Sequence, residues 1–580
     1  MKTFILSILL FVPTIQAQSE FRFFINNINL PINNFGVLAD VDIPPDGPQG
    51  RYQDINFLFS GGFWLSGYNG DTLWASGQAT ASRIENYIPG NVDSNQYDTR
   101  YKIYVVEESD QPFGSSWQQW SSAVDIGAEF YDGDNDGIYN PVDLNGNGEW
   151  DINEDKPDII GDQVAWCVFN DGVYPRLLFK NVPPLGIEIH QTVFGYRSNT
   201  APQLKNVLFI RYKIFNKGTV NPLLDSVYFT AWADADLGVN FADDLVGSDT
   251  LTKSGFIYGL DPDPGGFGDE VPSFFINLLQ GPYSYIPGET FIDRNKNGTY
   301  EDSVDIPLDT AYNHQGPIKG IQPLPGAKNQ KMTAFTHYQS SDPVLGGPFN
   351  EFEARNYMLG RQKLGDLIDP CEWNLEEVRG GVDCNLVNPL YWYSGDPETN
   401  SGWLNNRPHD QRMLVHTGPF SLEVDKPITI IVGYTIGQGN SPLNSVTVGK
   451  EVSAFVQQFY QSNFDDNVLP VEEENNLIVE EFKLFQNYPN PFHPSTKIKY
   501  SIPTSPLNPS PYQGEGQRER LITLKIYDVL GTEIAVLVNK EKLAGAYEIE
   551  WDASRFPSGV YFYQLRSGSF VQTKKMILLK

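Results

Sequence analysis

The sequence predicts a mostly β, multi-domain protein with few helices. Its 580 residues exceed what one core normally supports, since domains usually hold roughly 100–200 residues. Residues that favour strands and turns are abundant, with 30 Tyr, 36 Phe and 52 Gly. Apolar residues also recur with strand-like patterns in segments such as VLFIRYKIFNKG and PITIIVGYTIG.

The N-terminus has the pattern of a secretory signal. In MKTFILSILLFVPTIQAQSE, Lys2 precedes an apolar run, and Ala17 stands where a signal peptidase would cut. We therefore predict a signal peptide at residues 1–17, the alternative being a buried first strand. The apolar run is too short to span a bilayer, and no later stretch reaches about 18 uninterrupted apolar residues, so we expect no transmembrane anchor.

Residues 18–464 form the predicted acidic β-rich extracellular region, as one unit or two subdomains. The formal net charge of the chain is −31. This charge argues against nucleic acid or an anionic membrane as partner, and it is compatible with cation binding or with plain solubility. Asn69-Gly70 between two aromatic-rich runs predicts a hairpin. An amphipathic pattern that begins near Ser445 predicts a helix.

The three cysteines have different predicted roles. Cys371 and Cys384 enclose a segment whose Gly380-Gly381 pair lets the chain double back, so in an oxidising compartment we expect a disulfide between them. Cys167 lies within a strand-like segment and is expected to be a small buried hydrophobic residue.

Residues 131–155, YDGDNDGIYNPVDLNGNGEWDINED, match two overlapping calcium-loop patterns of the form D-x-[DN]-x-[DN]-G-x5-E. The match is complete from Asp143 and partial from Asp132, where Asp143 takes the last place in lieu of Glu. Calcium prefers six to eight oxygen ligands, and alternate residues of a tight loop can all point inward. The candidate ligands are Asp132, Asp134, Asp136, Asn140 and Asp143 in the first loop, and Asp143, Asn145, Asn147, the carbonyl of Glu149, Asp151 and Glu154 in the second.

A third copy begins at Asp293 in DRNKNGTYEDSVD, with Val304 in the last place. Its candidate ligands are Asp293, Asn295, Asn297 and Glu301. None of the loops has the flanking helices of an EF-hand, and they resemble the calcium loops of thrombospondin type 3 repeats or dockerins. We therefore expect a structural calcium ion, not a switch. The alternative is a metal-free polar turn, because Asp, Asn and Gly are ordinary turn formers.

The segment WADADLGVNFADDLVGSDT is the remaining acidic cluster. Strand geometry places Trp232, Asp234 and Asp236 on one face, and Asp243, Asp244 and Asp249 could return toward them through a loop. Such a group suits a glycosidase, a metal site or a solvated edge. No HExxH, nucleophile elbow, phosphate loop or dinucleotide motif occurs in the chain. The sequence thus leaves enzymatic activity open and leans against it.

An acidic, core-poor stretch, residues 465–481, is the predicted linker to a C-terminal unit. Residues 482–580 contain short alternating strands separated by turns rich in Gly and Pro, which predicts an immunoglobulin-like antiparallel β-sandwich. Within it, residues 504–520 combine Pro, Ser, Gly and charge without apolar periodicity, which indicates a flexible insertion.

The C-terminal unit carries a set of motifs in a fixed order: YPNPF at 488–492, IYD at 526–528, WD at 551–552, SGVY at 558–561 and KKM at 574–576. On these motifs it resembles the type A C-terminal sorting domain of the bacterial type IX secretion system. His493 and the insertion depart from the usual pattern. The resemblance implies export across the outer membrane, the secretion machinery as a partner, and often removal of the domain with attachment to surface lipopolysaccharide.

Together these features predict a secreted or outer-surface protein of structural or adhesion type, exported by the type IX system and stabilised by calcium. The alternative is a secreted carbohydrate-active protein, hydrolytic or merely binding, that uses exposed aromatic residues and the region of Asp234 and Asp236. Surface lipopolysaccharide or polysaccharide is the candidate partner outside the secretion machinery. The body resembles uncharacterised secreted proteins with the same tail, a resemblance that transfers no activity.

Overall fold

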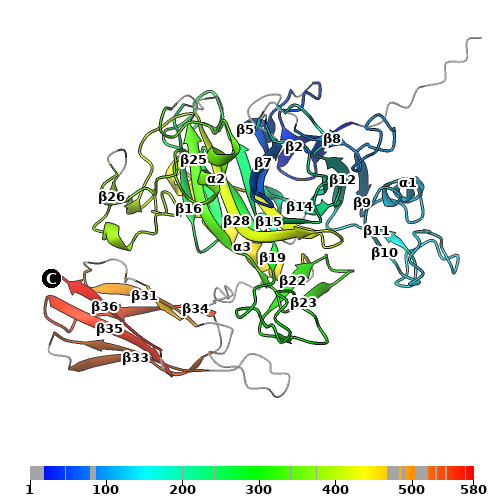
Figure 1. Cartoon of the computed structure of the whole chain (residues 1–580). Coiled ribbons are helices and arrows are strands. Elements are labelled where there is room, and N and C mark those ends of the chain that lie inside the picture. The colour runs from blue at the N-terminus through cyan, green and yellow to red at the C-terminus, as the bar shows by residue number, and fades with distance from the viewer. Residues whose placement is uncertain are drawn as a thin grey trace, which may run out of the picture. The chain divides into compact units, whose positions relative to one another are not determined.

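The computed structural model describes most of the chain between residues 19 and 579 (Figure 1). It leaves undescribed residues 1–18, 46, 79–85, 177, 180, 198–200, 240, 241, 340, 341, 374, 376, 467–481, 486, 488, 489, 491, 503–519, 530, 531, 543, 544, 569 and 580. The predicted signal peptide, nearly all of the linker and nearly all of the insertion therefore lie outside the described residues. Arg520, which we had placed in the insertion, begins a strand.

Two large antiparallel sheets make up the body of the protein (Figure 1). The first sheet has ten strands in the order β25 (Met332–Gln339), β28 (Gln411–Glu423), β15 (Leu223–Asp234), β6 (Ser60–Asn69), β3 (Leu38–Ala39), β2 (Ile28–Asn33), β4 (Gly50–Tyr52) and β5 (Ile55–Leu58), with β1 (Glu20–Phe24) on β2 and β7 (Thr72–Gln78) on β6. The second sheet has nine strands in the order β16 (Asp244–Asp249), β17 (Ser254–Gly259), β18 (Ser273–Gln280), β29 (Ile428–Gly437), β14 (Val207–Asn216), β13 (Ile187–Gly195), β12 (Gln163–Asn170) and β8 (Ile88–Pro89), with β9 (Tyr104–Glu107) on β12.

The two sheets face each other across an aromatic core. The ring of Phe63 on β6 lies 6.2 Å from that of Phe169 on β12 and 5.2 Å from that of Tyr212 on β14. The next residue of β6, Trp64, points to the opposite face, where it stacks on Trp232 and Tyr338. Phe63 and Trp64 are both fully buried although they point to opposite faces, so β6 is covered on both sides, and its first eight residues are all buried.

Three helices, α1 (Ser115–Val124), α2 (Glu351–Met358) and α3 (Pro442–Gln461), occur among the described residues. The helix predicted near Ser445 is confirmed as α3. It lies directly on the second sheet, because a Cβ atom added to Gly437 of β29 would be 2.3 Å from the Cα atom of Gly449 in α3. No helix in the described part of the chain is long and apolar enough to cross a membrane.

Five short two-stranded ribbons extend from the body: β10 (Phe130–Tyr131) with β11 (Lys156–Pro157), β19 (Tyr283–Ser284) with β24 (Lys328–Asn329), β20 (Phe291–Ile292) with β21 (Ile306–Pro307), β22 (Thr310–His314) with β23 (Ile321–Pro325), and β26 (Val378–Arg379) with β27 (Gly402–Trp403). Two of them, β10–β11 and β20–β21, carry the aspartate loops described below. The first lies beside α1 (Figure 1).

The covalent and turn predictions are confirmed. Cys371 and Cys384 form a disulfide, and both Gly380 and Gly381 have positive φ angles where the chain reverses between them. Cys167 is a buried free thiol. The predicted hairpin joins β6 to β7, with its turn at residues 70–71.

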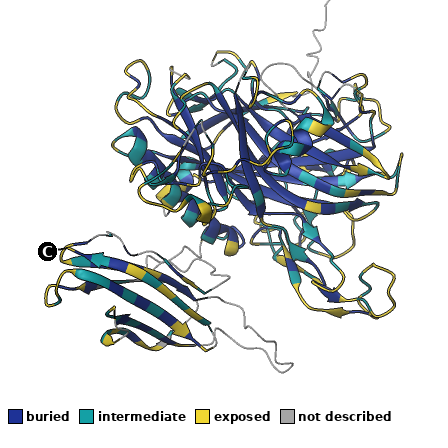
Figure 2. Cartoon of the chain, turned by 60° about the vertical axis from the view of Figure 1, so that its left-hand side comes forward, coloured by how far each residue is buried: buried dark blue, intermediate teal, exposed yellow. Residues whose placement is uncertain are grey.

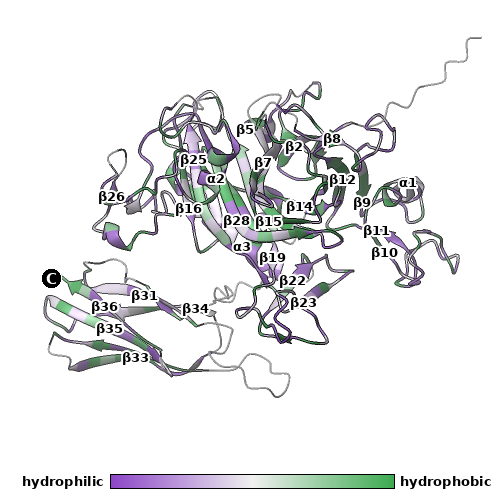
Figure 3. Ribbon diagram, in the orientation of Figure 1, coloured by the Kyte–Doolittle hydropathy of each residue, from purple (hydrophilic) through white to green (hydrophobic). Residues whose placement is uncertain are grey.

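The C-terminal unit is a separate small sandwich of two antiparallel sheets. One sheet has the order β30 (Lys483–Leu484), β31 (Ser495–Ile502) and β34 (Gly545–Asp552), and the other β33 (Glu533–Lys542), β32 (Arg520–Tyr527), β35 (Gly559–Ser567) and β36 (Phe570–Leu578). More exposed and less exposed residues alternate along most of β31 and β36, whereas a central strand of the body such as β13 is buried throughout (Figure 2). Hydropathy follows burial, with apolar residues dominating body strands such as β12 (Figure 3). The predicted immunoglobulin-like architecture is confirmed.

Candidate functional site

The three aspartate loops share one backbone design. We call the segments that begin at Asp132, Asp143 and Asp293 loop 1, loop 2 and loop 3. In each, the first Asp accepts a hydrogen bond from the backbone N–H five residues later: Asp132 from Gly137 at 2.9 Å, Asp143 from Gly148 at 2.8 Å, and Asp293 from Gly298 at 2.7 Å. These three glycines have φ angles of 77°, 81° and 79°, a left-handed conformation that a side chain would resist.

Each loop is closed by a buried carboxylate that binds the backbone at two points. Its two oxygens accept hydrogen bonds from the N–H groups of the second and ninth loop residues. Asp155 accepts from Gly133 at 3.0 Å and Asn140 at 2.7 Å, Glu154 from Leu144 at 2.7 Å and Asp151 at 3.0 Å, and Asp305 from Arg294 at 2.9 Å and Glu301 at 2.8 Å. The three segments are therefore copies of one structural motif.

This closure corrects the expected register of loop 1. We had placed Asp143 in its last position, shared with loop 2, but the structure closes loop 1 with Asp155. The reason is long-range pairing: Tyr131 of β10 lies opposite Lys156 of β11, which brings Asp155 beside the start of the loop. Loop 3 closes in the same way, with Asp305 next to β21 and not with Val304.

A sequence signal for this closure existed. Asp155 and Asp305 both stand in the pattern Asp-x-Pro, at the start of the strand that returns from the loop. Loop 2 is then an insertion within loop 1. The inserted loop packs closely on its host, because a Cβ atom added to Gly133 would lie 2.4 Å from the backbone nitrogen and oxygen of Glu154.

The side chains of the loops converge on a small space. In loop 1, one carboxylate oxygen from each of Asp132, Asp134 and Asp136 lies within 4.8 Å of the others. In loop 2, Nδ2 of Asn145 donates to Oδ2 of Asp151 at 2.6 Å, and Asn295 donates to Glu301 in the matching way in loop 3. The third and ninth residues of these loops therefore face each other, as ligands of one ion would.

The carboxylates of the loops differ in their electrostatic environment. Burial raises the pKa of the Asp155 carboxyl, and the charges of Asp134 and Asp132 raise it further. In contrast, hydrogen bonds from backbone N–H groups, that of Gly148 first, lower the pKa of Asp143. Ca–O distances of about 2.3–2.6 Å put opposite ligands about 5 Å apart, so the oxygen spacing in loop 1 is compatible with one shared ion.

A second acidic group forms at the end of β15. Asp234 and Asp236 are joined by Asp410, and one carboxylate oxygen of each lies within 4.8 Å of the others. We call these three residues the aspartate cluster. Arg412 donates to Oδ2 of Asp234 at 2.9 Å and to Oδ1 of Asp410 at 2.8 Å. Burial raises the pKa of Asp234 to about 7, with Asp236 and Asp410 adding to the rise and Arg412 opposing it.

The structure separates the other predicted members of this group. Asp244 is buried, and the charges of Asp236 and Asp410 add to the rise that burial causes in its pKa. Asp249 instead lies at the far end of β16, where it accepts a hydrogen bond from Leu251 N–H. Trp232 is fully buried, and its Nε1 donates to the Tyr338 hydroxyl at 2.9 Å. It offers no exposed face on which a sugar could stack. Asp410 was missed as a member because it follows Asp236 at a great distance in sequence.

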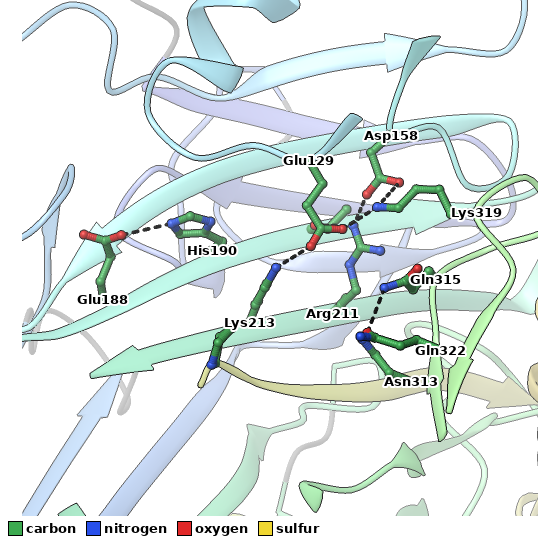
Figure 4. Close-up of polar contacts among 12 residues, drawn as sticks. Glu129, Asp158, Glu188, His190, Arg211, Lys213, Asn313, Gln315, Lys319 and Gln322 are labelled. Atoms are coloured by element: carbon green, nitrogen blue, oxygen red, sulfur yellow. Dashed lines mark hydrogen bonds and ion pairs between the residues drawn. The ribbon is translucent and has the colours of Figure 1, made fainter. Parts of the chain in front are cut away.

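An ion-pair network on the second sheet is the third polar group of the body (Figure 4). Glu129 pairs with Lys213 and Lys319, while Asp158 pairs with Lys319 and Arg211. The cavity beside it measures about 10 Å³, the space of about one water molecule. Since both carboxylates are paired and the space is so small, this network has the character of a structural element, not of a substrate site.

In the C-terminal unit, several of the described motif residues lie in the core, among them Phe492, Ile526 and Trp551. Trp551 contacts Phe492 and Tyr561, with ring centroids 5.6 Å apart in both pairs, and Met576 is fully buried. The family model of the secretion system C-terminal sorting domain matches residues 486–579. No curated protein matches the sequence. The match identifies the C-terminal unit as a sorting domain, and the buried aromatic motif residues contribute to the core of its sandwich.

Proposed function

We propose that this protein, which its sorting domain directs out of the cell through the type IX secretion system, is a structural or adhesion-type surface protein whose aspartate loops bind calcium. The sorting domain engages the secretion machinery, and the body is the exported cargo. In this proposal calcium rigidifies loops at the surface of the body. The expected affinity is of the extracellular kind, on the order of 0.1–1 mM.

The observation that carries the calcium proposal is the repeated closure of the loops. A polar turn needs no buried carboxylate, yet loops 1, 2 and 3 each bury one and use both of its oxygens to fix the second and ninth backbone N–H groups. This arrangement holds the remaining oxygens in place before an ion arrives. In loop 1 it also holds three like charges together, which costs free energy unless a cation offsets them.

The structural role is favoured over a carbohydrate-active one by the environment of the acids. Asp234 is 1% exposed and paired with Arg412, and the neighbouring Trp232 is fully buried. A polysaccharide chain could not reach these groups without opening the sandwich.

Thermal melts of the full chain with calcium and with chelator test the calcium proposal. We expect calcium to raise the melting temperature and to protect residues 131–155 against proteolysis. The double variant Asp134→Asn/Asp136→Asn should lose the protection, whereas Asp269→Asn, an exposed carboxylate outside the loops, should retain it. Identical protection of the loop in calcium and chelator would refute the proposal.

The structural or adhesive role has its own test. The purified chain is screened against lipopolysaccharide and a panel of polysaccharides, with binding and product release measured in parallel. We expect either binding without turnover or no interaction. Release of shortened sugars would overturn this role in favour of a hydrolase.

A further inference from the structure

We infer that the aspartate cluster, with Asp244 beside it, is a second type of divalent-cation site, one that ties the two sheets of the body together. It differs from the aspartate loops in position and construction. Its residues come from strand ends that are far apart in sequence, and both Asp234 and the neighbouring Asp244 are buried. The inference does not depend on the loops binding calcium.

The position of the cluster is the first argument. Asp234 ends β15 and Asp410 immediately precedes β28, both strands of the first sheet, whereas Asp244 begins β16 at the edge of the second sheet. The two sheets already meet here, because the carbonyl of Asp244 accepts hydrogen bonds from Gln411 Nε2 at 2.9 Å and from His409 N–H at 3.2 Å. An ion at this point would therefore bridge the sheets.

Unsatisfied carboxylate oxygens are the second argument. Asp234 and Asp244 are both 1% exposed, and Oδ1 of each is buried without a hydrogen-bond donor. Such an oxygen is costly, since a buried acceptor without a partner forfeits the solvation that it had in water. Two of them at the same corner, on different sheets, indicate that a further positively charged group belongs there.

Charge balance is the third argument. Three carboxylates, those of Asp234, Asp236 and Asp410, lie together beside Arg412, which pairs with two of them, and Asp244 is close enough for the charges of Asp236 and Asp410 to act on it. When all are ionised the group carries about three net negative charges, and a divalent cation would reduce this to one.

The chemistry of the donors selects the ion. All ligands are carboxylate oxygens, which suit hard cations such as Ca²⁺ and Mg²⁺ and not the thiolate- or imidazole-preferring metals. One carboxylate oxygen from each of Asp234, Asp236 and Asp410 lies within 4.8 Å of the others, which matches two Ca–O bonds of about 2.4 Å, whereas Mg²⁺ would need a tighter set. Ca²⁺ is therefore the expected occupant.

Asp236→Asn is the variant that tests this site. Asp236 is half-buried, and its substitution leaves both ion pairs of Arg412 in place. The full chain is melted with CaCl₂ and with chelator, in a background that carries Asp134→Asn and Asp136→Asn so that loop 1 does not contribute. Asp269→Asn in the same background is the matched control.

Two opposite shifts are expected. In chelator, Asp236→Asn should melt at a higher temperature than its background, because one of the repelling charges is gone. With calcium about a hundredfold above the dissociation constant, the background and the control should gain about 3–5 °C, and Asp236→Asn should gain much less. An equal gain in Asp236→Asn and the control would overturn the inference, since calcium would then act elsewhere.

Direct binding keeps the test informative if a variant folds poorly. Equilibrium dialysis of the folded wild-type chain with Ca²⁺ counts the bound ions, and Asp410→Asn and the loop variant are measured alongside. Loss of one ion in Asp410→Asn supports the site. If Asp410→Asn binds as many Ca²⁺ ions as the wild type and only the loop variant binds fewer, the cluster is not a cation site. The proposal that the loops bind calcium would then still hold.

Discussion

Replacing Asp305 by Asn should open loop 3 and leave the sheets intact. Asp305 is 6% exposed and accepts from Arg294 N–H at 2.9 Å and from Glu301 N–H at 2.8 Å. Asn retains one acceptor and turns an NH₂ group toward the other N–H. A hydrogen bond to a charged group contributes about 1.5–3 kcal/mol, and the remaining bond weakens toward the neutral value of about 1 kcal/mol. The free energy of opening the loop should therefore fall by about 2–4 kcal/mol.

Amide hydrogen exchange in calcium-free buffer measures this loss where it occurs. A change of about 2–4 kcal/mol in the opening free energy corresponds to roughly 30- to 1,000-fold faster exchange at Arg294 and Glu301. Asp269→Asn removes a charge without touching the loop and should leave both amides unchanged. Equal exchange at these amides in Asp305→Asn and the wild type would show that the carboxylate does not close the loop, and the shared motif would fail with it.

Three further predictions concern other parts of the body. Removing the disulfide with Cys371→Ser and Cys384→Ser should cost about 3 kcal/mol, as expected for a loop of this length, and denaturant unfolding measures it. Gly133→Ala should cost about 1–3 kcal/mol by overpacking, because its Cβ would lie 2.4 Å from backbone atoms, whereas Gly347→Ala, with its nearest atom at 3.4 Å, should be nearly neutral in the same melts. Burial lowers the pKa of His416 to about 3, below the unfolded value of about 6.5, so the unfolded state binds an extra proton as the pH falls and stability decreases. Between pH 6 and pH 4 the free energy of unfolding of the wild type should fall by about 1.4 kcal/mol more per pH unit than that of His416→Gln. Equal pH dependence of the two proteins would contradict this.

The fold class and the C-terminal sandwich were predictable because their signals are local. Strand alternation, the helical pattern that begins near Ser445, and the turn residues of the sorting domain all act within about ten residues. The same holds for the first six positions of each aspartate loop, where the Gly at the sixth position sets the backbone reversal.

The errors in the candidate sites have one origin. The sequence pattern predicts that Asp143 closes loop 1, because it counts residues along the chain. In the structure, pairing of β10 with β11 brings Asp155 to the loop instead. Likewise, Trp232 was expected beside the acids as a usable surface, but the sheet is covered on both faces and buries it.

The sequence by itself determined that this protein is exported, β-rich and equipped with acidic loops, because the sorting-domain motifs and the loop ligands each lie in short contiguous segments. Only the tertiary structure decided which acids meet. Asp234 lies opposite Arg412 because β15 pairs with β28, and this pairing carries Asp410 to the cluster. Such meetings depend on how two sheets pack as wholes, which no local run of residues encodes.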